Sequence, residues 1–126
     1  MSQPSESLNQ VVLVGRVSAA PESRELPSGD TVVSFRVVVD RPPSRAPRAD
    51  KQAPRRQVDV IDVACWSRRT QRSAGALTAD AEVRVEGALR RRFFAAAGAR
   101  ASRYEVEAER IARVSVARAA KASSEG

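Results

Sequence analysis

The chain has 126 residues, a hydrophobic fraction of 42% and a formal net charge of +7, which fits one domain with a compact core. It contains no histidine and a single cysteine, Cys65, so it lacks the usual zinc ligands and the usual base of histidine-dependent catalysis, and it cannot form an internal disulfide. No apolar run approaches the length of a membrane span and no basic-plus-apolar leader is found, so we expect a soluble cytoplasmic protein with no metal, no cofactor and no membrane contact.

Two β-branched segments predict the first two strands. The first is the apolar run Val11–Val17, which is interrupted by Gly15. A glycine inside a strand indicates a bend or bulge, as a small barrel needs at its corners. The second covers residues 31–39, where apolar and polar side chains alternate as in a half-buried strand. Its predicted core residues are Val33, Phe35, Val37 and Val39.

The middle of the chain predicts a third strand over residues 58–66 and a helix over residues 68–78. In the strand, alternation assigns Ile61, Val63 and Cys65 to the core. Trp66 then lies on the outer face. The helical segment is weakly amphipathic and is interrupted by Gly75.

Residues 81–94 and 103–113 predict the last two strands, connected by a loop of small residues at 95–101. Tyr104, like Phe35, is expected in the core rather than on a binding surface. The side chains assigned to the interior by alternation are Val83, Val85, Gly87, Leu89, Tyr104, Val106 and Ala108.

The order of these elements is strand, strand, strand, short helix, strand, strand. This is the order of an all-β, five-stranded Greek-key barrel of the OB-fold type, with the helix between the third and fourth strands. We expect one OB-fold domain over residues 9–114, with flexible ends at residues 1–8 and 115–126.

The basic excess is concentrated in two short segments. Residues 41–57 and residues 90–103 each carry a net charge of +5, while the other residues together are slightly acidic. A surface that is charged only for solubility would spread the excess. The first segment contains four of the seven prolines, and we interpret it as a long mobile hairpin loop.

Both basic segments lie close to aromatic residues, and this combination predicts a binding surface. Single-stranded nucleic acid is bound without sequence reading by a positive groove and by rings on which bases stack. No residue pair resembles a nucleophile with its base, so we expect no catalytic residues. The predicted DNA-binding residues are Trp66, Phe94, Phe93, Arg90, Arg91, Arg92, Arg68, Arg69, Arg41, Arg55, Arg56 and Arg36.

Each part of this pattern has a second interpretation, and these stay open at the level of sequence. The arginine-rich segments can be solvated surface, and Trp66 can pack on a partner subunit or on the helix. One of Phe93 and Phe94 can be structural, because neighbouring strand residues face opposite ways. Arg24 can simply pair with a neighbouring glutamate.

Several segments resemble the bacterial single-stranded DNA-binding protein family. They are the opening VLVGRV at residues 12–17, Pro21-Glu22 and Arg24, PSG at 27–29, VIDVACWSRR at 60–69 and VRVEGAL at 83–89, within roughly residues 9–114. The resemblance implies sequence-independent binding and protection of single-stranded DNA in replication, recombination or repair. It also places stacking aromatics at Trp66 and Phe94, whereas Pro43 and Val60 stand where the family often has rings.

The resemblance further implies a homotetramer that is nucleoid-associated in the cytoplasm, with dimers pairing through the first strand; a homodimer is the alternative. The sequence ends in Glu125-Gly126 without the family's acidic tail, so it resembles a short, tailless paralogue or a chain cut to the DNA-binding domain. Partners that need the tail are therefore not expected. Three rivals remain: a dimeric OB-fold accessory protein of replication restart, an RNA-binding OB protein, and a protein-interaction subunit with weak nucleic-acid binding.

Overall fold

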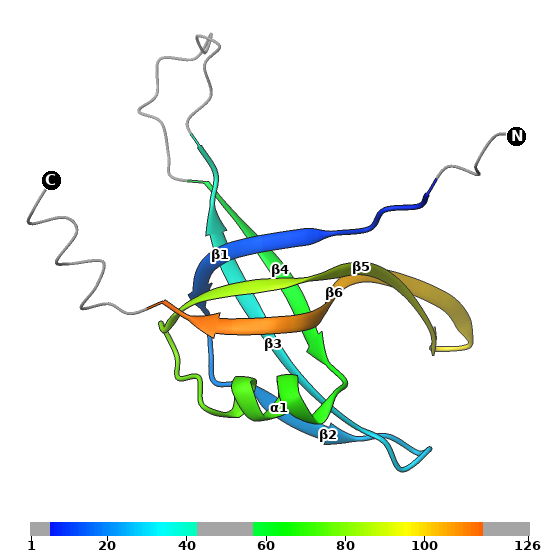
Figure 1. The fold of residues 1–126 in the computed structure, drawn as a ribbon. Coiled ribbons are helices and arrows are strands. Elements are labelled where there is room, and N and C mark those ends of the chain that lie inside the picture. The colour runs from blue at the N-terminus through cyan, green and yellow to red at the C-terminus, as the bar shows by residue number, and fades with distance from the viewer. Residues whose placement is uncertain (1–5, 43–56, 115–126) are drawn as a thin grey trace, which may run out of the picture.

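The computed structural model describes residues 6–42 and 57–114. This part of the chain forms six strands and one helix (Figure 1). They are β1 (Val11–Val17), β2 (Glu22–Glu25), β3 (Thr31–Asp40), β4 (Val58–Cys65), α1 (Arg68–Gly75), β5 (Glu82–Ala96) and β6 (Ala99–Arg113). The predicted all-β class and the position of the helix are confirmed.

Five of the strands close into a barrel, because β1 pairs with two different neighbours. Its residues Val11–Arg16 pair with β5, and Arg16 and Val17 also pair with β3. The ring then runs from β5 through β6 and β4 to β3. The change of neighbour requires Gly15, since any side chain there would collide with the backbone carbonyl of Val38. The predicted corner at Gly15 is confirmed.

The short strand β2 was not predicted. Its sequence, Glu-Ser-Arg-Glu, has no apolar alternation and all four residues are exposed. It forms because it pairs with the first part of β3, from Thr31 to Ser34, next to the barrel. β2 therefore widens the sheet beside β3 and β4 without contributing to the core.

The barrel interior is filled mainly by valines, as the alternation predicted. Val63 and Cys65 are 1% and 0% exposed, and Phe35 is 5% exposed. The helix α1 covers one end of the barrel through Ala74, and Leu77, just after the helix, belongs to the same core cluster. Ser67 caps the N-terminus of the helix, because its hydroxyl accepts a hydrogen bond from the backbone N–H of Thr70. The helix ends at Gly75, three residues before the predicted end.

The predicted loop at residues 95–101 is wrong, because β5 and β6 continue through most of it. Their connection is the tight turn at Ala97 and Gly98, with φ angles of 54° and 78°. Two successive positive φ values are characteristic of a type I′ hairpin turn, in which glycine is favoured at the second position. The result is a long hairpin that extends beyond the barrel, at the right of Figure 1.

The predictions that Leu89 and Tyr104 are core residues are also wrong, since their exposed fractions are 43% and 58%. Leu89 does point to the side of β5 that alternation predicted, because it lies directly opposite the buried Val106 of β6. However, β1 pairs with β5 only as far as Gly87, and β4 pairs with β6 from Val106. Toward the turn, the described residues provide no second layer over the side of the hairpin that carries Leu89 and Tyr104, so these two side chains remain exposed.

Most of the predicted loop at residues 41–57, residues 1–5 of the predicted flexible N-terminus and all of the predicted flexible C-terminus lie outside the described residues. The only helix in the described ranges has eight residues, which is too short to cross a bilayer.

Candidate nucleic-acid interface

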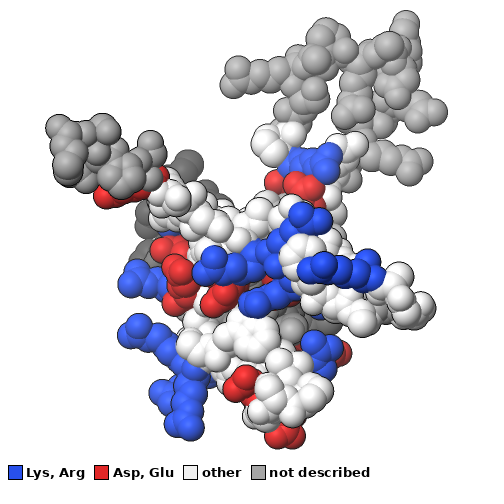
Figure 2. Space-filling view, turned by 90° about the vertical axis from the view of Figure 1, so that its right-hand side faces the viewer, with Lys and Arg blue, Asp and Glu red and all other residues white. Residues whose placement is uncertain are grey.

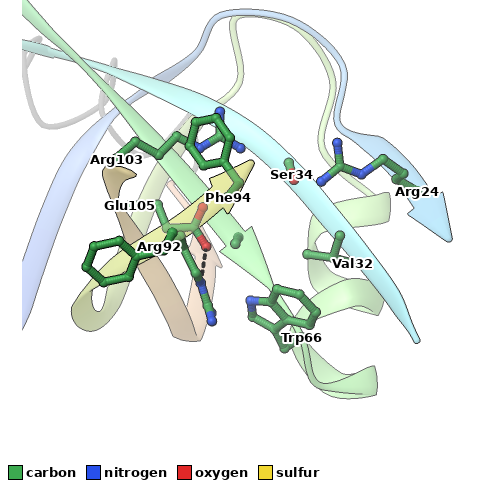
Figure 3. Close-up of a pocket in the computed structure, with 10 residues that line it drawn as sticks. Arg24, Val32, Ser34, Trp66, Arg92, Phe94, Arg103 and Glu105 are labelled. Atoms are coloured by element: carbon green, nitrogen blue, oxygen red, sulfur yellow. Dashed lines mark hydrogen bonds and ion pairs between the residues drawn. The ribbon is translucent and has the colours of Figure 1, made fainter. Parts of the chain in front are cut away.

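A groove runs over the outer face of β2, β3 and β4 and is bordered by the β5–β6 hairpin. It consists of two adjoining hollows of about 400 and 380 Å³ that share Arg24, Ser34, Arg103 and Glu105. Figure 3 shows the first hollow, with Arg24 extending into it from β2 and the side chains of the hairpin lying opposite. The residues that complete the first hollow are Val32, Ala64, Trp66, Arg92, Phe93 and Phe94.

Trp66 lies in the floor of this groove, because it follows directly after the end of β4 with the parity of the outer face. The guanidinium carbon of Arg92 lies 4.9 Å from the centre of the indole ring, a cation–π contact. The indole N–H is buried and donates to no acceptor within the described residues. Trp66 and Arg92 thus cover one another, and Ala64, which lines the same hollow, is 3% exposed.

Two of the predicted DNA-binding arginines are held by carboxylates of β6. Arg92 Nε donates to Glu105 Oε2 at 3.0 Å, and Arg90 Nε donates to Glu107 Oε1 at 2.9 Å. Glu105 is only 7% exposed, and the charge-assisted hydrogen bond from Arg92 gives its buried carboxylate a partner. The basic segment is therefore less positive toward the groove than its arginine count suggests.

The two phenylalanines of the hairpin lie on opposite faces of it, and neither is part of the core. Phe94 is 43% exposed and lines the groove, with the guanidinium carbon of Arg103 lying 5.7 Å from the ring centre. Phe93 is 53% exposed, and the guanidinium carbons of Arg91 and Arg100 lie 4.9 and 4.7 Å from its ring centre. The exposure of both rings leaves each of them accessible to a ligand.

The other predicted arginines are not brought together with Trp66. Arg36 lies in the second hollow and pairs with Asp62 at 3.0 Å. Arg41 pairs with Asp59 at 2.8 Å, and this hydrogen bond raises the pKa of its guanidinium above the ordinary value. Arg69 lines a separate small hollow beside β6. Arg68 is exposed at the start of α1, while Arg55 and Arg56 lie outside the described residues.

Three residues of the hairpin and the groove were missed by the sequence analysis. Arg24 lines both hollows, because β2 positions it beside β3. Arg103 was counted in the basic segment but not among the binding residues, although it too lines both hollows. Tyr104 was assigned to the core. For Arg103 and Tyr104 the available signal was the length of the alternating pattern, since strands of 15 residues are longer than a small barrel requires. Arg24 had no such signal, because β2 has no apolar alternation.

The charge distribution follows this geometry. Figure 2 views the side toward which the hairpin extends, and shows basic side chains crossing the middle of that face with acidic ones beside them. Arg91, Arg100 and Arg103 form no ion pair with a carboxylate within the described residues. The described ranges also hold no cluster of three His, Cys, Asp or Glu side chains suited to a metal ion.

Cys65, directly before Trp66, is a core residue as predicted. It is 0% exposed, and burial raises the pKa of its thiol to about 11, partly opposed by a hydrogen bond with Thr70. Reactive cysteines have a lowered pKa and an accessible sulfur. Cys65 has neither property, so it acts here as a small apolar side chain.

Comparisons with known proteins agree with this geometry. The model of the single-strand binding protein family matches residues 8–114. The chain is 34% identical over 87 residues to the single-stranded DNA-binding protein of Oceanobacillus iheyensis, which covers 69% of this chain and 50% of that protein. It is 33% identical over 105 residues to single-stranded DNA-binding protein A of Bacillus subtilis, covering 82% of this chain and 58% of that protein.

The chain thus spans about half the length of the curated relatives it matches. Its fold is similar to that of a solved structure described as "Plasmodium falciparum SSB complex with ssDNA", with a TM-score of 0.68 at 19% identity, covering 90% of this chain and all of that one. This likeness concerns the fold. The match to the family model over residues 8–114 and the similarity to the two relatives show that the chain belongs to the single-strand binding protein family.

Proposed function

We propose that this protein binds single-stranded DNA in the groove, without reading its sequence and without catalysis, and so protects it during replication, recombination or repair. One observation carries the proposal. Two large rings, Trp66 and Phe94, lie in one open groove together with the guanidinium groups of Arg24, Arg92 and Arg103. Family membership and the names of the relatives support the same conclusion.

The chemistry of the groove explains why binding would be independent of sequence. Every base has a flat π-face that can stack on Trp66 or Phe94, and each such stack contributes about 1–3 kcal/mol. Guanidinium groups bind the phosphates, which are the same at every nucleotide. For a base to stack on Trp66, Arg92 leaves the ring that it covers in the free protein and becomes available to a phosphate.

The fluorescence of Trp66, the only tryptophan in the chain, tests the proposal. We expect quenching that saturates at the binding stoichiometry as oligo(dT) is added, and little response to duplex DNA of equal length. Competition with oligo(U) of the same length separates a DNA-binding from an RNA-binding protein. An indole that does not respond to oligo(dT), in a protein that does not retain it at low salt, would refute the proposal.

We also propose an oligomeric state, a homotetramer, and a location, the nucleoid. On β1 the outward side chains Val12 and Val14 are 44% and 50% exposed, which would suit pairing with another subunit and a homotetramer; a homodimer is the alternative. The protein would act at the nucleoid in the cytoplasm. Light scattering gives the mass, and Val14→Lys should reduce it if β1 pairs subunits.

A second candidate function has one observation in its favour. Because Arg90 and Arg92 are paired with Glu107 and Glu105, part of the groove's positive charge is neutralised within the protein. A protein-interaction subunit with weak nucleic-acid binding would have this property. It is favoured if oligo(dT) does not bind at moderate salt while the chain co-purifies with a protein partner.

A further inference from the structure

The β5–β6 hairpin has a second face, and of its residues only Phe93 also lines the groove. Directly opposed residues of an antiparallel pair point to the same side, so the register separates the two faces. Arg92 lies opposite Arg103 on the groove face. Arg91 lies opposite Tyr104, and Phe93 opposite Ser102, on the other. We call this second surface the reverse face; its residues are Leu89, Arg91, Phe93, Arg100, Ser102 and Tyr104.

The reverse face combines exposed rings with cations. Phe93 and Tyr104 are 53% and 58% exposed. The guanidinium carbon of Arg91 lies 4.9 Å from the centre of the Phe93 ring and 5.6 Å from that of Tyr104, and Arg100 lies 4.7 Å from Phe93. These are the two components that a single strand needs, a flat π-surface for bases and a positive charge for phosphates.

The two faces differ in how their arginines are partnered. On the groove face, Arg90 and Arg92 are held by carboxylates. On the reverse face, the only polar side-chain partner of Arg91 within the described residues is the hydroxyl of Ser102, at 3.3 Å. Neither Arg91 nor Arg100 meets a carboxylate there. Both charges are therefore free to attract a polyanion.

A hollow at the tip of the hairpin connects the two faces. It has a volume of about 380 Å³ and is lined by Phe94 of the groove and by Phe93 and Arg100 of the reverse face, with small residues at the turn. Phe93 also borders the groove. A strand that leaves the groove at Phe94 thus reaches Phe93 and Arg100 without crossing an acidic or closed surface.

We propose that the reverse face is a second stacking surface on which the same DNA strand continues around the hairpin, with Tyr104 and Phe93 stacking bases and Arg91 and Arg100 binding phosphates. The inference rests on the proposed function of the groove and extends it. A second copy of the chain fits less well, because two reverse faces brought together would oppose like charges.

The test is binding of oligo(dT) in a series of lengths across and beyond the roughly 4–16 nucleotides that one OB-fold occupies. For the native chain, affinity should rise again once the oligonucleotide is longer than the groove. Tyr104→Ala should bind the shortest ligands like the native chain and lose at least about fivefold on the longest, the lower limit for a lost stack. Tyr104→Phe, which keeps the ring, should retain the gain with length.

Two controls keep the outcomes separate. Arg72→Ala removes an exposed arginine of α1 that lines neither the groove nor the hollow at the hairpin tip, and it should not alter the dependence on length; Arg100→Gln should reduce it. Phe94→Ala should weaken binding at every length.

The proposal is overturned if Tyr104→Ala loses nothing at any length, loses the same factor at all lengths, or changes the mass of the oligomer, which would assign the reverse face to a second copy. If the native chain binds no oligonucleotide, or if Phe94→Ala has no effect, the function of the groove itself fails and the reverse face fails with it.

Discussion

Replacing Glu107 by glutamine should make DNA binding both tighter and more sensitive to salt. Glu107 accepts a hydrogen bond from Arg90 at 2.9 Å and lies 3.6 Å from Arg92. In the native protein, a phosphate that binds Arg90 must displace this carboxylate. Glutamine keeps an oxygen that can accept the hydrogen bond but removes the charge, so Arg90 becomes available to the DNA.

The magnitude follows from counterion release. Each phosphate neutralised on a single strand contributes about −0.7 to the slope of log K against log salt. Freeing Arg90 should therefore steepen the slope by about 0.7, so that a fourfold rise in salt reduces affinity about 2.6-fold more than in the native chain. The assay is a titration of labelled oligo(dT) at several salt concentrations, with the slope as the measured quantity.

Glu86→Gln is the matched control. It removes the same charge from a glutamate that also pairs with an arginine, Arg84, at 3.0 Å, but Glu86 lies on the part of β5 that pairs with β1 and forms no ion pair with Arg90 or Arg92. If both variants change the slope equally, the effect reflects net charge alone. An unchanged slope in Glu107→Gln, together with a reduced slope in Arg90→Gln, would show that Arg90 already binds DNA in the native protein and that our reasoning is wrong.

Three further predictions concern stability. Arg92→Gln should lower the free energy of unfolding in urea by about 1–3 kcal/mol, because the buried Glu105 loses a charged donor; adding Glu105→Gln should restore most of it, and no restoration would mean that Arg92 acts through packing. Gly15→Ala should cost about 1–3 kcal/mol by overpacking against Val38, whereas Gly75→Ala, with open space around it, should be neutral or slightly stabilising. The pKa of the Cys65 thiol is raised from 9.0 to about 11, so folding disfavours the thiolate. The protonated thiol therefore contributes its full share to the free energy of unfolding below about pH 9, and this share is lost as the pH rises through about 11. Iodoacetamide at pH 9 should thus modify the native protein far more slowly than the urea-unfolded chain, and equal rates would contradict a buried thiol.

Alternation in the sequence was sufficient to predict most of the barrel. It assigned Val63 and Cys65 to the core correctly, because each side of a barrel strand faces either the interior or the outside. It failed at Leu89 and Tyr104, since parity gives the side of a strand but not whether another layer covers that side. β2 was missed for a related reason: it is held by its pairing with β3 and not by burial of its own side chains.

The candidate site was predictable in composition but not in detail. The proximity of arginines to Trp66 and Phe94 followed from the sequence, and the structure brings these rings into one groove. The pairing of Arg92 with Glu105 could not be predicted from the sequence, because it depends on the register of β5 against β6, and the two residues are 13 positions apart in the chain. Counting charges along the sequence cannot reveal such a partner. For the same reason it overestimated the positive charge in the groove.

The way in which the barrel closes has a consequence for the order of its assembly. β5 and β6 are joined by a two-residue turn and pair over 14 positions, so this hairpin can form from local contacts alone. β1, β3 and β4 precede it in the chain, and until it arrives both β1 and β4 have an unpaired edge. The hairpin then inserts between them as one piece, and the seam with β4 contains only two parallel register pairs, Val63–Val106 and Ala64–Glu107. We expect this seam to form last during folding and to open first, with the slowest step set by the long loop that it closes.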